Sequence, residues 1–343
     1  MDMQNKLALQ KGGFKRKWRW KPSSILILAV FFIFALASLS IGVARGAVSI
    51  PLAEMGSILF LGEQSDHYGI LMNIRLPRAL VGAAVGINLA LAGAILQGIM
   101  KNPLADPQII GVNAGAGFVA ITILILFPQS QWLLTPGAFI GAMLAAILVY
   151  ALSWKNGIQT TRIILAGVAV ASLLGAGVSG LLVFYSDRVH GAMQFIVGGL
   201  GTSSWPQLKI IAPYTIIGLL LALISSNRLN LLLLSDNNAR SLGLNVEGNR
   251  LLLTALASLL AASAVSIVGL LGFVGLVVPH AARLMIGNNY RMLIPASALL
   301  GAGVVTLSDM IARTVFAPIE LPVGIVMAAV GAPFFLYLLK RGG

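Results

Sequence analysis

Cysteine is absent from the 343-residue chain, and charged residues are scarce. Without a thiol, the chain holds no disulfide, thiolate metal site or redox-active cysteine. Charged residues make up 10% of the sequence, compared with about 25% in a typical soluble domain. Together with an apolar share of 58%, this excludes an ordinary water-soluble domain and predicts an all-α polytopic membrane protein.

The charges that remain are unbalanced, with 23 Lys and Arg against 10 Asp and Glu, for a net charge of +13. A basic patch indicates nucleic-acid binding when it lies on a soluble surface. Here the cations fall between apolar runs, where they report membrane topology instead. We therefore expect the lipid bilayer, and no nucleic acid, as a partner.

Apolar windows of the length that crosses a bilayer, about 20 residues each, recur along the chain. Ten spans are expected, at residues 24–44, 77–100, 108–127, 135–153, 162–184, 208–226, 250–267, 268–286, 292–311 and 321–339. The seventh and eighth share one apolar stretch, and the glycines of "SIVGLLGFVG" permit a tight turn that divides it. Residues 1–23 form a basic cytoplasmic segment, and residues 24–341 form one transmembrane domain.

Lys and Arg residues in the connecting segments predict the orientation of the spans. With the N-terminus inside, only six of the 23 fall outside, namely Arg45, Arg75, Arg78, Arg188, Lys209 and Arg313. Both termini are therefore expected to be cytoplasmic. The longest inner loop is then at about residues 228–249.

Several kinds of chemistry are missing. No glycine is followed by lysine, so the phosphate-binding GxxxxGK[ST] loop is absent and the chain is not expected to hydrolyse ATP. The three histidines are scattered, and we expect neither a metal site nor catalytic residues. All ten acidic residues fall in loops or at span ends, whereas an ion-coupled carrier usually keeps an acid near the midplane. Energy is expected from a partner, with an ion-coupled secondary carrier as the alternative.

The inner loop "LLLLSDNNARSLGLNVEGNR" predicts a short helix. Ser235 is a good N-cap, Asp236 and Arg240 suit the two ends of the dipole, and Gly243 suits a left-handed stop. Ala239 and Leu242 would form a small apolar face for a groove on another protein. A solvated loop with helical tendency is the alternative.

The stretch "RLPR" places Arg75 and Arg78 at the outer start of the second span, where Pro77 suits the first helical turn. Cations there oppose the helix dipole. Arg313 adds a third cation on the same side, and Asp309, one turn earlier, is placed to neutralise it in part. Anchoring to lipid phosphate is one explanation for these positions.

Five segments in sequence order resemble one family: "RLPR", "KNPLADPQIIGVNAGAG", "ARSLGL", "GFVGLVVPHAARL" and "LPVGIVMAAVGAPFFLYLLKRG". The chain is similar over residues 24–341 to the FecCD permease subunits of ATP-binding-cassette (ABC) importers for iron siderophores, haem and vitamin B12. The resemblance implies a multi-pass permease of the cell membrane, which is not itself an enzyme.

The resemblance also implies partners and site residues. A second permease, identical or paralogous, would complete the path; two cytoplasmic ATPase subunits would use the ATP, so the chain itself needs no cofactor; and an extracytoplasmic binding protein would deliver the cargo. Coupling to the ATPase is implied for Asp236, Ala239, Arg240, Leu242 and Gly243. A cytoplasmic gate is implied for Asn102, Leu104, Thr160 and Thr161, and docking of the binding protein for Arg75, Arg78 and Arg313. The expected cargo is an iron(III) siderophore, with cobalamin and haem as alternatives.

Overall fold

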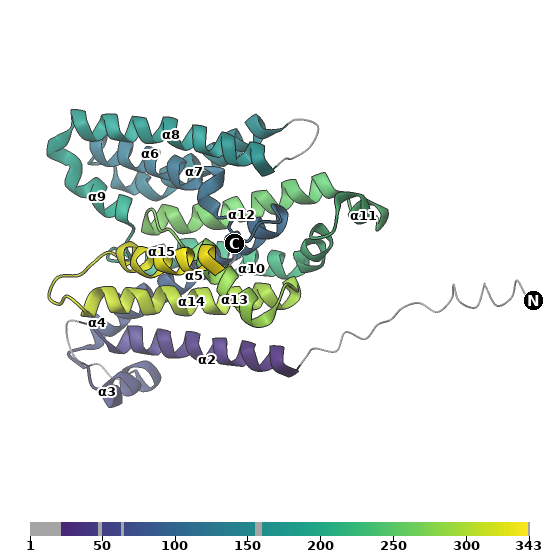
Figure 1. Cartoon of the computed structure of the whole chain (residues 1–343). Helices are drawn as coiled ribbons and strands as arrows, with labels where there is room; N and C mark the ends of the chain where they lie inside the picture. The colour runs from purple at the N-terminus through teal and green to yellow at the C-terminus, as the bar shows by residue number, and fades with distance from the viewer. Residues whose placement is uncertain (1–21, 47–49, 63–64, 155–159, 342–343) are drawn as a thin grey trace, which may run out of the picture.

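The computed structural model describes residues 22–46, 50–62, 65–154 and 160–341. Of the predicted N-terminal segment, residues 1–21 lie outside the described residues. The described chain folds into helices, and the long ones run side by side (Figure 1). This confirms the predicted all-helical class.

Each of the ten predicted spans overlaps one long helix. The long helices are α2 (Pro22–Ala44), α5 (Leu76–Ile99), α6 (Val112–Leu126), α7 (Leu134–Ser153), α8 (Thr160–Phe184), α10 (Trp205–Leu232), α12 (Val246–Val268), α13 (Val274–Ile286), α14 (Tyr290–Thr314) and α15 (Val323–Arg341). Helix α6 begins at Val112 instead of 108, and α13 begins at Val274 instead of 268. Seven of the long helices are long and apolar enough to cross a membrane, and α6, α13 and α15 provide shorter apolar stretches. The predicted division of the seventh and eighth spans is confirmed, because α12 ends at Gly269, which has a φ of +79°.

Short elements connect the long helices. They are α3 (Leu52–Gly56), η1 (Ser57–Leu61), α4 (Tyr68–Ile70), η2 (Leu71–Arg75), η3 (Pro107–Ile110), η4 (Gln131–Leu133), η5 (Ser186–Arg188), α9 (Val189–Val197) and α11 (Asp236–Ser241). In Figure 1, α11 and the start of α2 lie at the right, while α3 and α9 lie at the left. We call these the α11 end and the α9 end.

Helix α5 forms the centre of the molecule, with 89% of its apolar window buried. Two glycines allow this packing. Gly86 lies against the carbonyl of Gly301 in α14, and Gly93 against the carbonyl of Gly275 in α13. A Cβ at either position would overlap the neighbouring backbone, so the close approach of these helices requires glycine.

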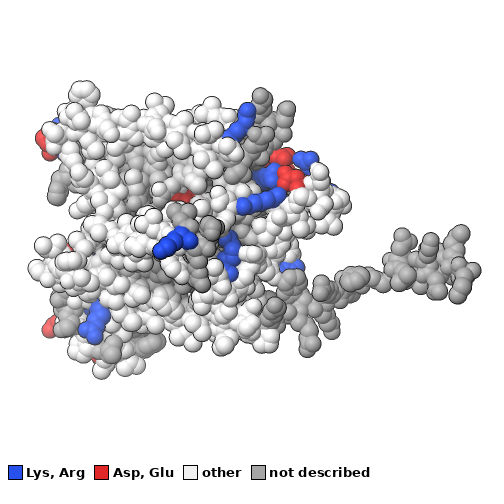
Figure 2. Space-filling model, in the orientation of Figure 1, with Lys and Arg blue, Asp and Glu red and all other residues white. Residues whose placement is uncertain are grey.

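The outer helices show the opposite pattern. Only 22% of the apolar window of α2, 17% of that of α8 and 28% of that of α10 is buried. Large apolar side chains such as Ile33, Leu173 and Ile224 are exposed on them. Figure 2 shows a mostly uncharged surface, with a few charged side chains near the middle of the view and the densest group toward α11. This is the surface expected of helices that face lipid or the apolar surface of another membrane chain.

Candidate functional site

A cluster of five charged residues lies at the α9 end, and we call it the arginine cluster: Arg75, Arg78, Asp309, Arg313 and Glu320. The Nε of Arg78 donates to both carboxylate oxygens of Asp309 (3.2 and 3.1 Å), and its Nη2 donates to Oδ1 (2.9 Å). Its Nη1 donates to Oε2 of Glu320 (2.9 Å). The Nε of Arg313 lies 3.0 Å from Oδ2 of Asp309, within ion-pair distance although its N–H is not aligned for a hydrogen bond. Asp309 therefore neutralises two arginines at once.

Arg75 and Arg313 also contact the end of α2. Arg75 Nη1 donates to the carbonyl of Ala44 (2.9 Å), and Arg313 Nη2 donates to the carbonyl of Gly42 (2.9 Å). The last turn of α2 contains no basic residue of its own. The final carbonyls of a helix lack partners within that helix and carry its negative dipole end. The guanidinium groups of Arg75 and Arg313, from other segments of the chain, provide hydrogen-bond donors for these carbonyls.

The structure brings the three predicted docking arginines together, and the predicted pairing of Asp309 with Arg313 is confirmed. All three arginines are nevertheless buried, at 4% exposure for Arg75, 7% for Arg78 and 5% for Arg313. The half-exposed member is Glu320, with 48% of its side chain accessible. Nothing in the sequence connects Glu320 with this cluster. The surface that the arginine cluster presents to solvent therefore includes the carboxylate of Glu320 as well as guanidinium groups.

At the opposite end, α11 is a six-residue helix as predicted. Ser235 caps it by accepting from the N–H of Asn238 (3.3 Å), and Gly243 has a φ of +82°. Asp236 is paired with Lys101 (3.1 Å) and with Arg250 (2.9 Å). Burial raises the pKa of the Asp236 carboxyl, but hydrogen bonds from Lys101 and Arg250 outweigh this effect and hold the pKa below its ordinary value. These pairs tie α11 to the turn that follows α5 and to α12.

The observed apolar face of this segment differs from the predicted one. Ala239 is 1% exposed and belongs to the core of its own chain, so it is not available to a partner. Leu242 is 62% exposed, and Leu233 and Leu234 just before α11 are also exposed. Arg240 is exposed beside Glu247, with 3.5 Å between their charged atoms. The outward apolar side chains are therefore leucines on either side of the helix.

The four predicted gate residues lie where α5 leads into η3 and where α8 begins. The Oδ1 of Asn102 accepts from the N–H of Leu104 (2.9 Å), which closes a tight turn. Thr161 is exposed in the first turn of α8, and the side chain of Thr160 lies outside the described residues. The two elements meet where Gly167 of α8 lies against the carbonyl of Ile109. The turn gives Asn102 a structural role in this chain.

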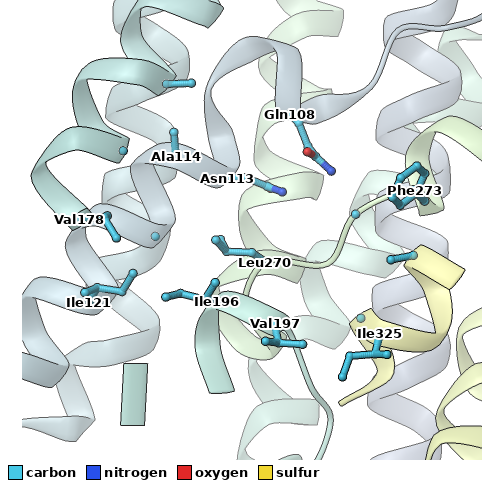
Figure 3. A pocket seen from close by; sticks show the side chains of 16 residues that line it. Gln108, Asn113, Ala114, Ile121, Val178, Ile196, Val197, Leu270, Phe273 and Ile325 are labelled. Carbon is cyan, nitrogen blue, oxygen red and sulfur yellow. The ribbon is translucent and has the colours of Figure 1, made fainter. Parts of the chain in front are cut away.

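A cavity of about 590 Å³ lies between α6, α8, the end of α9, the start of α15 and the loop at residues 269–273. Sixteen described residues line it, and none is charged. Gln108 and Asn113 provide the only polar side chains among them, and Figure 3 shows both amide groups turned toward the same space. Both lie in the segment "KNPLADPQIIGVNAGAG" that carries the family resemblance, but nothing in the sequence assigns either of them a role.

Asp106 lies behind Gln108, and its Oδ1 accepts from the N–H of that residue (2.9 Å). It is in a loop, as predicted, but the loop folds back among the helices. Asp106 is only 9% exposed, and its Oδ2 and the carbonyl of Leu89, in the middle of α5, both lie 3.1 Å from where a Cβ on Gly275 would sit. Asp106 therefore lies nearer to the middle of α5 than its position in a loop indicates, because hydropathy does not register a loop that re-enters the bundle.

The geometry agrees with comparison to known proteins. Residues 27–341 match the model of the FecCD transport family. The chain is 36% identical over 96% of its length to the Fe(3+)-citrate import system permease protein YfmD of Bacillus subtilis, of which it covers 97%. It is 43% identical over 79% of its length to the cobalamin import system permease protein BtuC of Halobacterium salinarum, of which it covers 73%.

The fold has a solved counterpart as well. An inward-facing ABC transporter chain assigned to the metal-chelate type superimposes with a TM-score of 0.78 at 30% identity, covering 92% of this chain and 99% of that one. The relatives are permease subunits and not enzymes, and they work with ATPase and permease partners. The chain belongs to the FecCD transport family and is a multi-pass membrane permease of an ABC importer.

Proposed function

We propose that the imported cargo is an iron(III)–siderophore complex. The observation that supports this proposal is the cavity, whose sixteen described lining residues include no metal ligand of the His, Asp, Glu or Cys type. The described residues also contain no cluster of three such side chains elsewhere. A metal that arrives wrapped in an organic chelator needs no ligand from the protein. Cobalamin and haem fit the same argument and remain the alternatives.

Cells with and without this chain test the cargo. Uptake of a radiolabelled ferric siderophore should depend on the chain, whereas labelled cobalamin and haem should enter the two strains equally. A strain that loses cobalamin or haem uptake, and keeps all ferric siderophore uptake, would contradict the proposal.

We propose that the cavity is one half of a path completed by a second permease, identical or paralogous. Helix α8 forms one wall of the cavity. Of the seven helices long and apolar enough to cross a membrane, it has the smallest buried share of its apolar window, 17%, and it exposes Leu165 and Leu173. In this arrangement the α11 end and both termini face the cytoplasm, where two ATPase subunits bind. The chain itself holds no cofactor, because ATP is used by those subunits.

We propose that α11 and the residues just after it couple the permease to the ATPase subunits. Five residues contribute in two roles: Asp236, Ala239, Arg240, Leu242 and Gly243. Leu242 and Arg240 are exposed and are the contact residues, whereas Ala239, Asp236 and Gly243 hold the helix in place. Asn102, Leu104, Thr160 and Thr161 are proposed to narrow the path between the cavity and the α11 end.

Docking of an extracytoplasmic binding protein is proposed at the arginine cluster. Because Arg75, Arg78 and Arg313 are buried, an acidic side chain of the binding protein would reach Arg78 by displacing Glu320. Glu320 has 48% of its side chain exposed, against 9% for Arg78. The exchange replaces one carboxylate by another on the same guanidinium group and leaves the Asp309 pair intact.

A further inference from the structure

The two polar side chains in the cavity have no partners within the described chain. The amide groups of Gln108 and Asn113 form no hydrogen bond to another described residue, and Figure 3 shows both turned toward the space above Leu270. A carboxamide supplies two N–H donors and one acceptor. Polar groups of this kind, in an otherwise apolar pocket, set the orientation and identity of a ligand. Gln108 and Asn113 are therefore placed to read polar atoms on the cargo.

The backbone around the cavity offers helix ends of both signs. The first turns of α6 and α15 contribute Asn113 and Gly324 to its lining, but the N–H of Gly324 donates to the carbonyl of Gly198 (3.1 Å). The last residues of α9, Ile196 and Val197, bring the negative end of that helix to the same lining. At the start of α13 the carboxylate of Asp106 lies against Gly275. The backbone therefore adds no net attraction for an anion, and recognition of polar cargo atoms rests on the two carboxamides.

Among the described residues of this chain that line the cavity, none is a cation that could compensate a fully charged anion. Asp106, behind Gln108, supplies no positive charge in either protonation state. Arg188 donates to the carbonyl of Ile125, one turn beyond the lining residue Ile121, and its Nε lies 3.6 Å from a carboxylate oxygen of Asp187. The free-energy penalty for each uncompensated charge in such surroundings exceeds the stabilisation that the partial charge of a helix N-terminus offers.

We infer that the cavity accepts a charge-neutral ferric chelate with carbonyl or hydroxamate oxygens on its surface, and that Gln108 and Asn113 select it. This inference rests on the proposed import of an iron chelate. It separates two chemical classes of siderophore, neutral trihydroxamates and trianionic tris-catecholates.

Cysteine protection tests the inference without the selectivity of a binding protein. The chain has no cysteine, so Val178→Cys in the cavity wall gives a single reporter on this subunit in the assembled, nucleotide-free transporter. A neutral ferric trihydroxamate should slow labelling of the reporter by an uncharged maleimide, and a ferric tris-catecholate should not. The double variant Gln108→Ala/Asn113→Ala should raise the half-protecting concentration of the trihydroxamate about tenfold, as expected for two lost hydrogen bonds.

A matched variant and a charge variant complete the test. Gln131→Ala removes an exposed carboxamide outside the cavity and should leave protection unchanged, whereas Gln108→Lys should let the tris-catecholate protect. Equal protection by both chelates, no protection by the trihydroxamate, or an unchanged double variant would overturn the inference.

Transport by the wild-type complex separates this inference from the proposed function. Import of both ferric chelates at equal rates would overturn the selection by charge and leave iron import standing. Import of cobalamin or haem alone would overturn both.

Discussion

Asp309 is a buried carboxylate shared by two guanidinium groups from different helices. Arg78 of α5 contacts it with two of its nitrogens, and Arg313 of α14 lies within ion-pair distance of it. Breaking a buried pair costs more than the pair contributes, because an uncompensated charge remains. The arginine cluster therefore depends on this residue more than on its other acid, Glu320.

Replacing Asp309 by Asn should lower the free energy of unfolding by about 3 to 5 kcal/mol, because Arg78 and Arg313 then lack a full countercharge. Thermal unfolding of the purified protein in detergent measures the change. Asp187→Asn is the control, since that carboxylate is 76% exposed and pairs with Arg188 at the surface. Equal melting temperatures for the two variants would show that the cluster does not support the fold.

Replacing Glu320 by Gln should speed association with the binding protein, because it frees Nη1 of Arg78 and removes a negative charge from the proposed docking surface. We expect an increase of about two- to tenfold at low salt that shrinks as salt is added. Stopped-flow association at two ionic strengths measures it. Reversal of Arg75 and Arg78 to Glu is a poorer test, because it would bury additional carboxylates beside Asp309. A rate that does not respond to Glu320→Gln would remove Arg78 from the docking proposal.

The sequence identifies the unusual arginines but not their burial. Arg78 pairs with residues 231 and 242 positions away. No local pattern reports contacts of that sequence separation. Gln108 and Asn113 escaped notice for the same reason, because a polar residue in an apolar run is distinctive only once the surrounding helices enclose a cavity.

Among the elements, hydropathy located the long helices and capping located α11. Hydropathy did not locate the true starts of α6 and α13. The segment before α6 is an apolar 3-10 turn, η3, which hydropathy does not distinguish from a helical start. Ala239 was misassigned for a related reason: in a helix of six residues, three-residue spacing does not decide which residue faces the core.

Leu242→Asp should uncouple α11 from the ATPase. Leu242 is 62% exposed in the chain alone, so the variant should insert and fold normally, and the new charge becomes costly only when buried in the complex. Transport and cargo-stimulated ATP hydrolysis should both be lost. Leu61→Asp is the control, because Leu61 is similarly exposed at the α9 end.

Normal co-purification of the ATPase with the Leu242→Asp variant, together with unchanged stimulated hydrolysis, would contradict the coupling role. The pairs of Asp236 with Lys101 and Arg250 should hold α11 in place throughout the physiological range. Because the pKa of Asp236 is lowered, their contribution to stability is present above the ordinary pKa of an aspartate and is lost only as the pH falls below it.

For the whole molecule, the buried position of Asp106 leaves one feature that an ion-coupled carrier would share. Membership of the FecCD family indicates instead that ATP hydrolysis by a partner drives transport. We expect reconstituted transport to require the ATPase subunits and nucleotide, and to be unchanged when the proton gradient is collapsed while ATP is maintained. An ATPase variant that binds but does not hydrolyse ATP is the control. Cargo accumulation driven by a pH gradient without nucleotide would favour the carrier.

The contacts that complete the end of α2 also impose an order on biosynthesis. Gly42 receives its partner from Arg313, which lies 271 residues later in the chain. At about 5 to 20 residues per second, a ribosome needs on the order of 10 to 60 seconds to cover that separation. During this interval Arg78 has already left the ribosome, but its acidic partners Asp309 and Glu320 have not been made. The nascent chain must therefore hold this cation at the membrane, without these partners, until the ninth long helix arrives.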